Sequence, residues 1–138
     1  LYNENKEVDL YVGEQNSGQS SIVKNDVASQ VYDKVTLVKA SEQLKNLNIT
    51  DISILKIDTE GCEVEILKDL ENYLFDTDII YLEYHSESDR LEIDKILSKN
   101  YYLFYLNTFQ IHLGTVIYIS KELASINKQL FYKGSTKK

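Results

Sequence analysis

The chain has 138 residues, of which 43% are hydrophobic and 27% charged, and its formal net charge is −7. This length fits one domain, so we expect residues 1–132 to form part of a single domain and residues 133–138 a polar, basic tail. The negative charge argues against nucleic acids and anionic membranes as partners, because both attract basic surfaces. No apolar run approaches the about 20 residues that cross a bilayer.

Two residue counts bear on the compartment and on the extent of the chain. A single cysteine cannot form an internal disulfide, and no amino-terminal signal pattern is present, so we expect a cytoplasmic location. The sequence contains no methionine and begins with Leu1. Because an initiator methionine is seldom removed before a bulky leucine, we expect a piece of a longer, conceivably multidomain, polypeptide.

The hydrophobic pattern predicts alternating strands and helices. In chain order we expect a strand at 8–12, a polar loop at 13–21, a strand at 34–38, a helix at 41–47 capped by Ser41, a buried strand at 52–58, a helix at 63–74, a strand at 79–84, a helix from 86 or 88 to about 100, strands at 101–106 and 115–119, and a helix at 120–132. The middle of this order is typical of a doubly wound α/β sheet. The two late strands are expected to be antiparallel to each other.

Acidic side chains follow two neighbouring strands, at the edge of the sheet where α/β proteins keep their chemistry. Asp58 and Glu60 are separated by one residue, and so are Glu83 and His85, so each pair points one way on an extended chain. Neighbouring strands lie about 4.8 Å apart. The four side chains can therefore converge on one crevice and deprotonate a hydroxyl, attract a cation or hold a divalent ion.

Ordinary structural roles stay open for the same residues. Asp58 can cap the following helix, and Glu60 can favour its positive end. Glu83 in an apolar strand is costly unless it is paired, and Lys56 is a candidate partner. His85 at a strand end is more often a surface or satisfied histidine. Spacing alone does not decide between these roles and catalysis.

Two kinds of site are disfavoured by the sequence. Glu60, Glu63 and Glu65 open the predicted helix at 63–74 and would repel a phosphate from its amino terminus. No Gly-x-Gly-x-x-Gly or Walker sequence occurs. Cys62 has no cysteine partner, so we interpret it as a small buried residue and predict no metal site.

Residues 55–68 read Leu-Lys-Ile-Asp-Thr-Glu-Gly-Cys-Glu-Val-Glu-Ile-Leu-Lys and resemble the signature of the FkbM family of S-adenosylmethionine-dependent methyltransferases, L-K-I-D-V-E-G-A-E-x-E-V-L-K-G. The match is ungapped, with Cys62 in place of the usual alanine and Asp69 in place of the usual glycine. Residues 16–21 are similar to the family's N-x-S-G-x-S-S loop, and residues 79–84 to its next core strand. The resemblance covers roughly residues 7–120.

The resemblance implies a partial class I methyltransferase fold, a Rossmann-like doubly wound sheet with a parallel core and antiparallel carboxyl-terminal strands. It implies S-adenosylmethionine as methyl donor and a hydroxyl of a small molecule or glycan as the acceptor. The family's glycine-rich D-V-G-A-N-x-G cofactor loop, the acidic residue that ends its second strand and the first βα units are missing. Residues 1–132 therefore look like the carboxyl-terminal part of a methyltransferase domain, inactive on its own.

The resemblance also assigns roles to the candidate residues. As catalytic residues we expect Asp58 and Glu60 lining the crevice between donor and acceptor, with Glu83 or His85 assisting acceptor binding or proton removal. Contacts to the cofactor are expected from Asp58 and from a polar rim formed by Asn16, Ser17 and Ser20.

Two other functions stay open. The chain could be a non-catalytic remnant or scaffold module within a larger protein. It could also be a receiver domain phosphorylated on Asp58, although the acid pair near the first strand and the late lysine that receivers need are missing.

Overall fold

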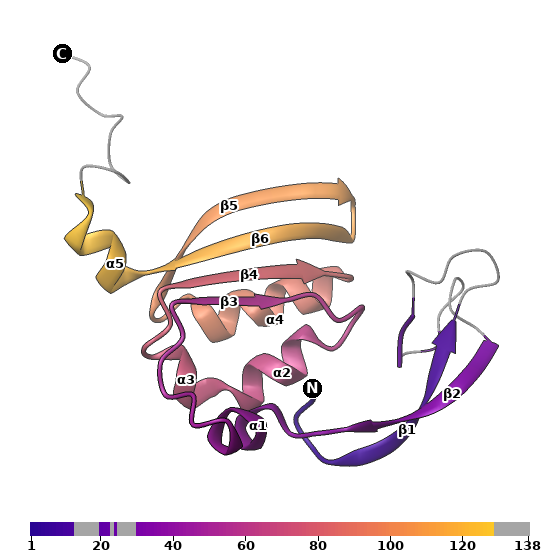
Figure 1. Ribbon diagram of the computed structural model, residues 1–138. Coiled ribbons are helices and arrows are strands. Elements are labelled where there is room, and N and C mark those ends of the chain that lie inside the picture. Colours follow the sequence, from indigo (N-terminus) through magenta and orange to yellow (C-terminus); the bar gives the residue numbers. More distant parts are fainter. Residues whose placement is uncertain (13–19, 23, 25–29, 129–138) are drawn as a thin grey trace.

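A computed structural model describes residues 1–12, 20–22, 24 and 30–128 (Figure 1). The elements run in the order β1 (Lys6–Val12), β2 (Gln30–Leu37), α1 (Ala40–Asn46), β3 (Ile54–Ile57), α2 (Glu63–Asp69), α3 (Glu71–Leu74), β4 (Ile79–Tyr84), α4 (Glu87–Leu97), β5 (Tyr101–Gln110), β6 (Leu113–Ser120) and α5 (Lys121–Ile126). Within these residues, no helix combines the length and apolarity needed to cross a membrane.

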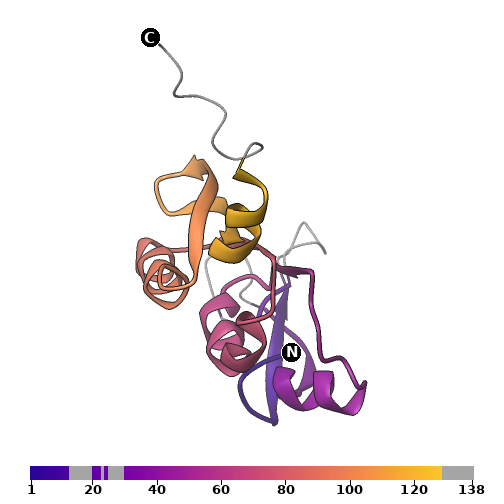
Figure 2. The same ribbon diagram turned by 90° about the vertical axis from the view of Figure 1, so that its left-hand side faces the viewer.

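The main sheet is mixed, with strand order β3-β4-β6-β5. β3 pairs with β4 in parallel, whereas β6 is antiparallel to both β4 and β5. α2 and α4 follow β3 and β4, pack against each other and cover one face of the sheet (Figures 1 and 2). The predicted antiparallel pairing of the two late strands is confirmed. In the described part of the chain, however, only β3 and β4 are paired in parallel, so the expected parallel core is a single pair.

The core lies between the sheet and its two helices. β4 alternates between buried and half-buried residues, as a strand with one covered face does. Its buried residues meet those of β6, α2 and α4: Ile80, Leu82, Tyr84, Val116, Tyr118, Ile66, Leu67, Ile93 and Leu97. Burying each large aliphatic side chain contributes about 1.5–3 kcal/mol. This packing fixes where β3 and β4 end, and hence where the acidic residues lie.

β3 was expected to be a buried strand, and this prediction is wrong for the structure described. β3 lies at the edge of the main sheet, and Ile54 is 66% exposed. β5, the other edge strand, carries exposed Tyr102 and Tyr105. The reason is the absence of any described strand beyond β3, which leaves its outer backbone groups without a neighbouring strand.

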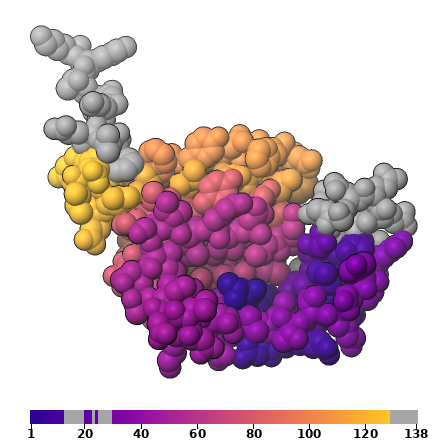
Figure 3. All heavy atoms as spheres, viewed as in Figure 1, coloured from indigo at the N-terminus to yellow at the C-terminus, as the bar shows by residue number. Residues whose placement is uncertain are grey.

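β1 and β2 form a separate two-stranded antiparallel sheet. They extend to one side of the main body, as the space-filling view also shows (Figure 3). Backbone bonds connect them to the rest: Tyr2 N–H donates to the Val38 carbonyl at 2.9 Å, and Ala40 N–H donates to the Tyr2 carbonyl at 2.8 Å. The two early strands therefore do not continue the main sheet. The predicted loop 13–21 lies mostly outside the described residues.

Two helix predictions need correction. The helix expected at 63–74 is two helices, because Leu70 leaves helical geometry with a ψ of 10°. Ser41 does not cap α1. Its own N–H and hydroxyl donate to the Asp69 carboxylate at 2.7 and 3.0 Å. Asp69, which stands where the family signature has glycine, thus supplies the acceptor for the amino terminus of α1. The predicted cap at Ser86 is confirmed, since its Oγ accepts the Asp89 N–H at 3.0 Å.

Candidate active site

The carboxyl ends of β3 and β4 lie side by side, because Ile57 pairs with Leu82 in parallel register. Asp58 and Glu60 follow β3 in the turn that leads to α2, while Glu83 and His85 lie at the end of β4. The structure therefore brings all four predicted residues to one edge of the sheet.

The turn between β3 and α2 has an unusual backbone. Glu60 has a φ of 55° and Gly61 a φ of 105°. A non-glycine residue in the left-handed region costs about 1–3 kcal/mol and persists only where neighbouring contacts fix it. One such contact comes from far along the sequence, since the Ser21 hydroxyl donates to the Glu60 carbonyl at 2.9 Å.

Glu63 supplies most of the other contacts to this turn. Its side chain is 1% exposed. One carboxylate oxygen, Oε1, accepts the Thr59 N–H at 2.8 Å and the Thr59 hydroxyl at 3.1 Å, and the other, Oε2, accepts the Gly61 N–H at 3.1 Å. Burial alone would raise the pKa of Glu63, but the attraction of His85 and the donors on Thr59 and Gly61 outweigh it and lower the pKa.

Sequence reasoning missed Glu63 as a site residue and treated it only as one acid of a helix start. The available signal was the threonine four residues earlier together with the glycine between them. Such a glycine marks a tight turn whose N–H groups need an acceptor.

His85 lies between two carboxylates. Its Nε2 is 3.2 Å from Glu60 Oε2, and its Nδ1 is 3.7 Å from Glu63 Oε2. The second distance suits an ion pair but is too long for a hydrogen bond, so the buried Nδ1 has no hydrogen-bond partner among the described residues. The Glu63 carboxylate, followed by Glu60 and Glu83, raises the pKa of His85 against the opposing effect of burial. The neighbouring carboxylates therefore stabilise the charged form of the imidazole.

Asp58 and Glu83 form a second pair. Burial raises the pKa of Glu83, and the neighbouring Asp58 carboxylate raises it further. Lys56 was expected to pair with Glu83, but its ammonium lies 3.0 Å from Asp58 Oδ2 and its side chain is 60% exposed. The capping role considered for Asp58 is also wrong, because α2 begins after Cys62 with no side-chain cap.

This arrangement separates two functions within one cluster. Asp58 and Glu83 form a carboxylate pair in which the pKa of Glu83 is raised, while Glu60, Glu63 and His85 form a second group of charged side chains beside them. A carboxylate of raised pKa accepts a proton at near-neutral pH better than an ordinary one. Among the described residues, no three His, Cys, Asp or Glu side chains are grouped to hold a metal ion.

Comparison with known families identifies this arrangement. The family model for the methyltransferase FkbM domain matches residues 2–104, well over half of the chain. The chain belongs to the FkbM methyltransferase family. Searches of curated proteins and of solved structures return no match. The family match begins earlier than the resemblance over residues 7–120 and ends within β5, so β6 and α5 lie beyond it.

Ser21, the last residue of the segment that resembles the family's serine-rich loop, contacts the central motif at Glu60, although Ser21 was not among the predicted site residues. Asn16 and Ser17 lie outside the described residues. Ser20 is described and half-buried. Cys62 is buried as predicted, and burial, followed by the charge of Glu63, raises the pKa of its thiol to about 11. A thiol with this pKa is not a nucleophile at neutral pH.

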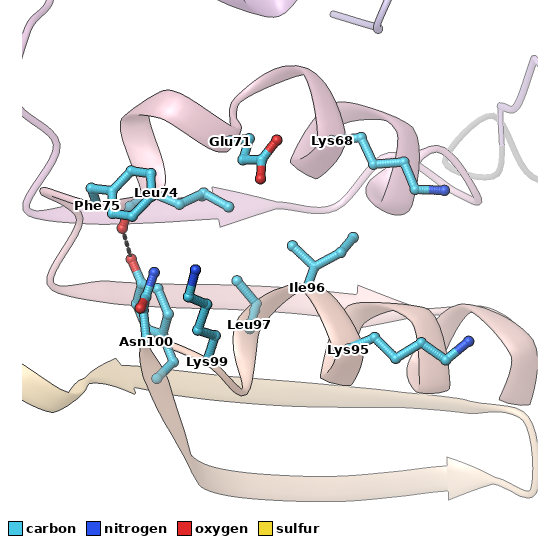
Figure 4. Close-up of a pocket in the computed structure, with 10 residues that line it drawn as sticks. Lys68, Glu71, Leu74, Phe75, Lys95, Ile96, Leu97, Lys99 and Asn100 are labelled. Atoms are coloured by element: carbon cyan, nitrogen blue, oxygen red, sulfur yellow. Dashed lines mark hydrogen bonds between the residues drawn. The ribbon is translucent and has the colours of Figure 1, made fainter.

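A pocket of about 340 Å³ lies elsewhere in this FkbM domain, between α3 and the carboxyl-terminal end of α4 (Figure 4). Leu74, Ile96 and Leu97 provide apolar walls, and Lys99 is one of three lysines at its rim. The Tyr101 hydroxyl closes one end by donating to the carbonyls of Leu74 and Thr77. None of the acidic cluster lines this pocket, which lies at the opposite end of the sheet from the candidate site (Figures 1 and 4).

Proposed function

We propose that the chain is part of a methyltransferase that uses S-adenosylmethionine to methylate a hydroxyl oxygen of a small molecule or glycan. One observation carries the proposal: in an FkbM chain, Asp58 and Glu83 lie together where two parallel strands end, and the pKa of Glu83 is raised. A base of this kind is what transfer to a hydroxyl requires from the protein.

S-adenosylmethionine would supply a methyl carbon already activated by its sulfonium. The residues at this site suit the positive charge of the sulfonium, because the carboxylates of Asp58, Glu60 and Glu83 lie around the ends of β3 and β4. Asp58 and Ser20 are the described residues that we assign to cofactor contact.

The protein's own task is alignment and proton removal. We assign proton removal to Glu83: its carboxylate would take the hydroxyl hydrogen of the acceptor, while S-adenosylmethionine would supply the methyl group and leave as S-adenosylhomocysteine. Asp58 keeps the pKa of Glu83 raised. His85 lies between Glu63 and Glu60, which raise its pKa, so we assign it the task of orienting the cluster or the acceptor and not that of the base.

The proposal includes a further segment that completes the domain. The described sheet has an open edge at β3, and the sequence lacks a glycine-rich cofactor loop. We propose that a preceding part of a longer polypeptide supplies that loop and a neighbouring strand. The chain alone is then inactive. The expected cytoplasmic location, supported by the free Cys62, belongs to the same proposal.

Turnover in the longest natural polypeptide that contains this chain tests the proposal. Release of S-adenosylhomocysteine is measured with a panel of small-molecule and glycan hydroxyl acceptors. We expect Asp58→Asn and Glu83→Gln to lower kcat at least about tenfold, with the thermal transition retained. Glu71→Gln is the matched control, because it removes one negative charge from α3. Unchanged turnover in both site variants would refute the assigned roles.

A further inference from the structure

We propose that Glu63 is a positioning residue: its buried carboxylate holds the turn between β3 and α2 and the imidazole of His85 in one fixed arrangement. The importance of this arrangement for methyl transfer rests on the proposed function, whereas the contacts themselves do not.

The contacts of Glu63 reach two different strands. Toward β3, its oxygens accept hydrogen bonds from three donor groups, two on Thr59 and one on Gly61, on both sides of Glu60 with its φ of 55°. Toward β4, Oε2 faces His85 Nδ1 at 3.7 Å. One carboxylate therefore determines both the path of the turn that carries Asp58 and Glu60 and the position of the ring that follows Glu83.

A merely structural helix start would not need this residue. Helices are ordinarily capped by short polar side chains at the surface, and burying a carboxylate is costly unless every oxygen is paired. Both oxygens of Glu63 are paired with donors that belong to the turn. The negative charge is needed by His85, whose other neighbours are Glu60 in the turn and Glu83 on β4, with Asp58 next to Glu83.

Replacing Glu63 by glutamine separates the charge from the shape. Glutamine keeps the side-chain length and one acceptor oxygen but loses the negative charge and places an amide NH₂ where the second oxygen stood. The Gly61 N–H then faces an amide NH₂, and the His85 ring loses the negative charge beside it. Alanine removes every contact and so reports the complete loss of the turn's support.

Nuclear magnetic resonance of the 138-residue chain tests the proposal without any assay of activity. The chain has two histidines, His85 and His112, so both ring signals can be followed in one titration. We expect the pKa of His85 to lie above 6.5 in the wild type and to fall in Glu63→Gln. The titration of His112 should be the same in Glu63→Gln as in the wild type. The titration of His85 should be the same in the control variant Glu71→Gln as in the wild type.

Amide exchange provides the second readout. In the wild type the N–H groups of Thr59 and Gly61 should be protected, and in Glu63→Ala their exchange should accelerate by about tenfold, the equivalent of one lost hydrogen bond. An unaltered His85 titration in a folded Glu63→Gln variant would overturn the proposal. If the variants fail to fold, the wild type still decides, because unprotected Thr59 and Gly61 amides would overturn it.

These outcomes are distinguishable from those of the proposed function. If no methyl transfer is found but His85 and the two amides respond as expected, the proposed function fails and the role of Glu63 in the turn stands. If turnover is found but the His85 titration and the exchange of the Thr59 and Gly61 amides are unaltered in the Glu63 variants, only the role of Glu63 fails.

Discussion

Gly114 on β6 offers the sharpest test of how the end of β4 is held. A Cβ atom at this position would lie 2.4 Å from the Asn107 carbonyl oxygen on β5, and 2.6 and 2.8 Å from the hydroxyl oxygen and Cζ of Tyr84 on β4. All three distances are well below van der Waals contact, and one of them is to backbone. Tyr84 is fully buried and cannot swing away. Gly114→Ala should therefore force β4, β5 and β6 apart locally and cost about 2–3 kcal/mol of unfolding free energy.

Chemical denaturation of the wild type, Gly114→Ala, Tyr84→Phe and the double variant measures this effect. Within the part of the chain that the structure describes, the buried Tyr84 hydroxyl has no hydrogen-bond partner, so Tyr84→Phe should be neutral or stabilising by up to about 1 kcal/mol. In the double variant the hydroxyl contact is gone while the Asn107 contact remains, so we expect partial rescue and a coupling energy of at least about 0.5 kcal/mol. A Gly114→Ala protein as stable as the wild type would refute the close packing of Gly114 against Asn107 and Tyr84.

Two further predictions concern the turn after β3. Because the pKa of Glu63 is lowered on folding, its contribution to stability is present above pH 4.5 and is lost as the pH falls through the folded-state pKa. Because the pKa of His85 is raised on folding, its contribution is present below pH 6.5 and is lost as the pH rises through the folded-state pKa. The loss of unfolding free energy in Glu63→Gln should thus be largest between about pH 4.5 and 6.5, and a difference independent of pH would contradict the ion pair. Ser21→Ala leaves the Glu60 carbonyl without its hydroxyl donor and should cost about 1–2 kcal/mol by chemical denaturation. The exposed Ser125, which donates to a carbonyl of its own helix, is the control, and Ser125→Ala should cost less than about 0.5 kcal/mol; equal costs would show that the contact between the two motifs is unimportant.

Local sequence determined the elements better than their partners. The strand predicted at 79–84 and the cap predicted at Ser86 are both confirmed, because each depends on residues a few positions apart. The separate β1–β2 sheet was not predictable, since no pattern within a strand says which strand it pairs with. The break at Leu70 was missed because its side chain continues the apolar stripe while its backbone does not continue the helix.

The candidate site shows the same division. The meeting of Asp58 with Glu83 was predictable, because a strand–helix–strand order favours parallel pairing of the two strands and each candidate pair is spaced by two residues. The role of Glu63 does not follow from spacing, because a glutamate at a helix start looks the same whether it is exposed or buried. Only the tertiary structure shows that its carboxylate turns back toward Thr59 and Gly61.

The charge of the cluster leads to a last prediction about the acceptor. Asp58 and Glu83 are neighbours of one another and of Glu60, and the cations beside them are Lys56 and His85. With Glu63 included, acids outnumber bases, so the cluster should favour a cation and repel an anion. One unit charge at about 4 Å is worth about 1 kcal/mol in water and more where solvent is excluded, which corresponds to roughly fivefold or more in kcat/KM. In the polypeptide that turns over S-adenosylmethionine, a neutral hydroxyl acceptor should therefore exceed its phosphorylated analogue by at least this factor at low salt. The preference should shrink in Glu60→Gln, and a better phosphorylated acceptor would mean that the acidic cluster does not face the acceptor.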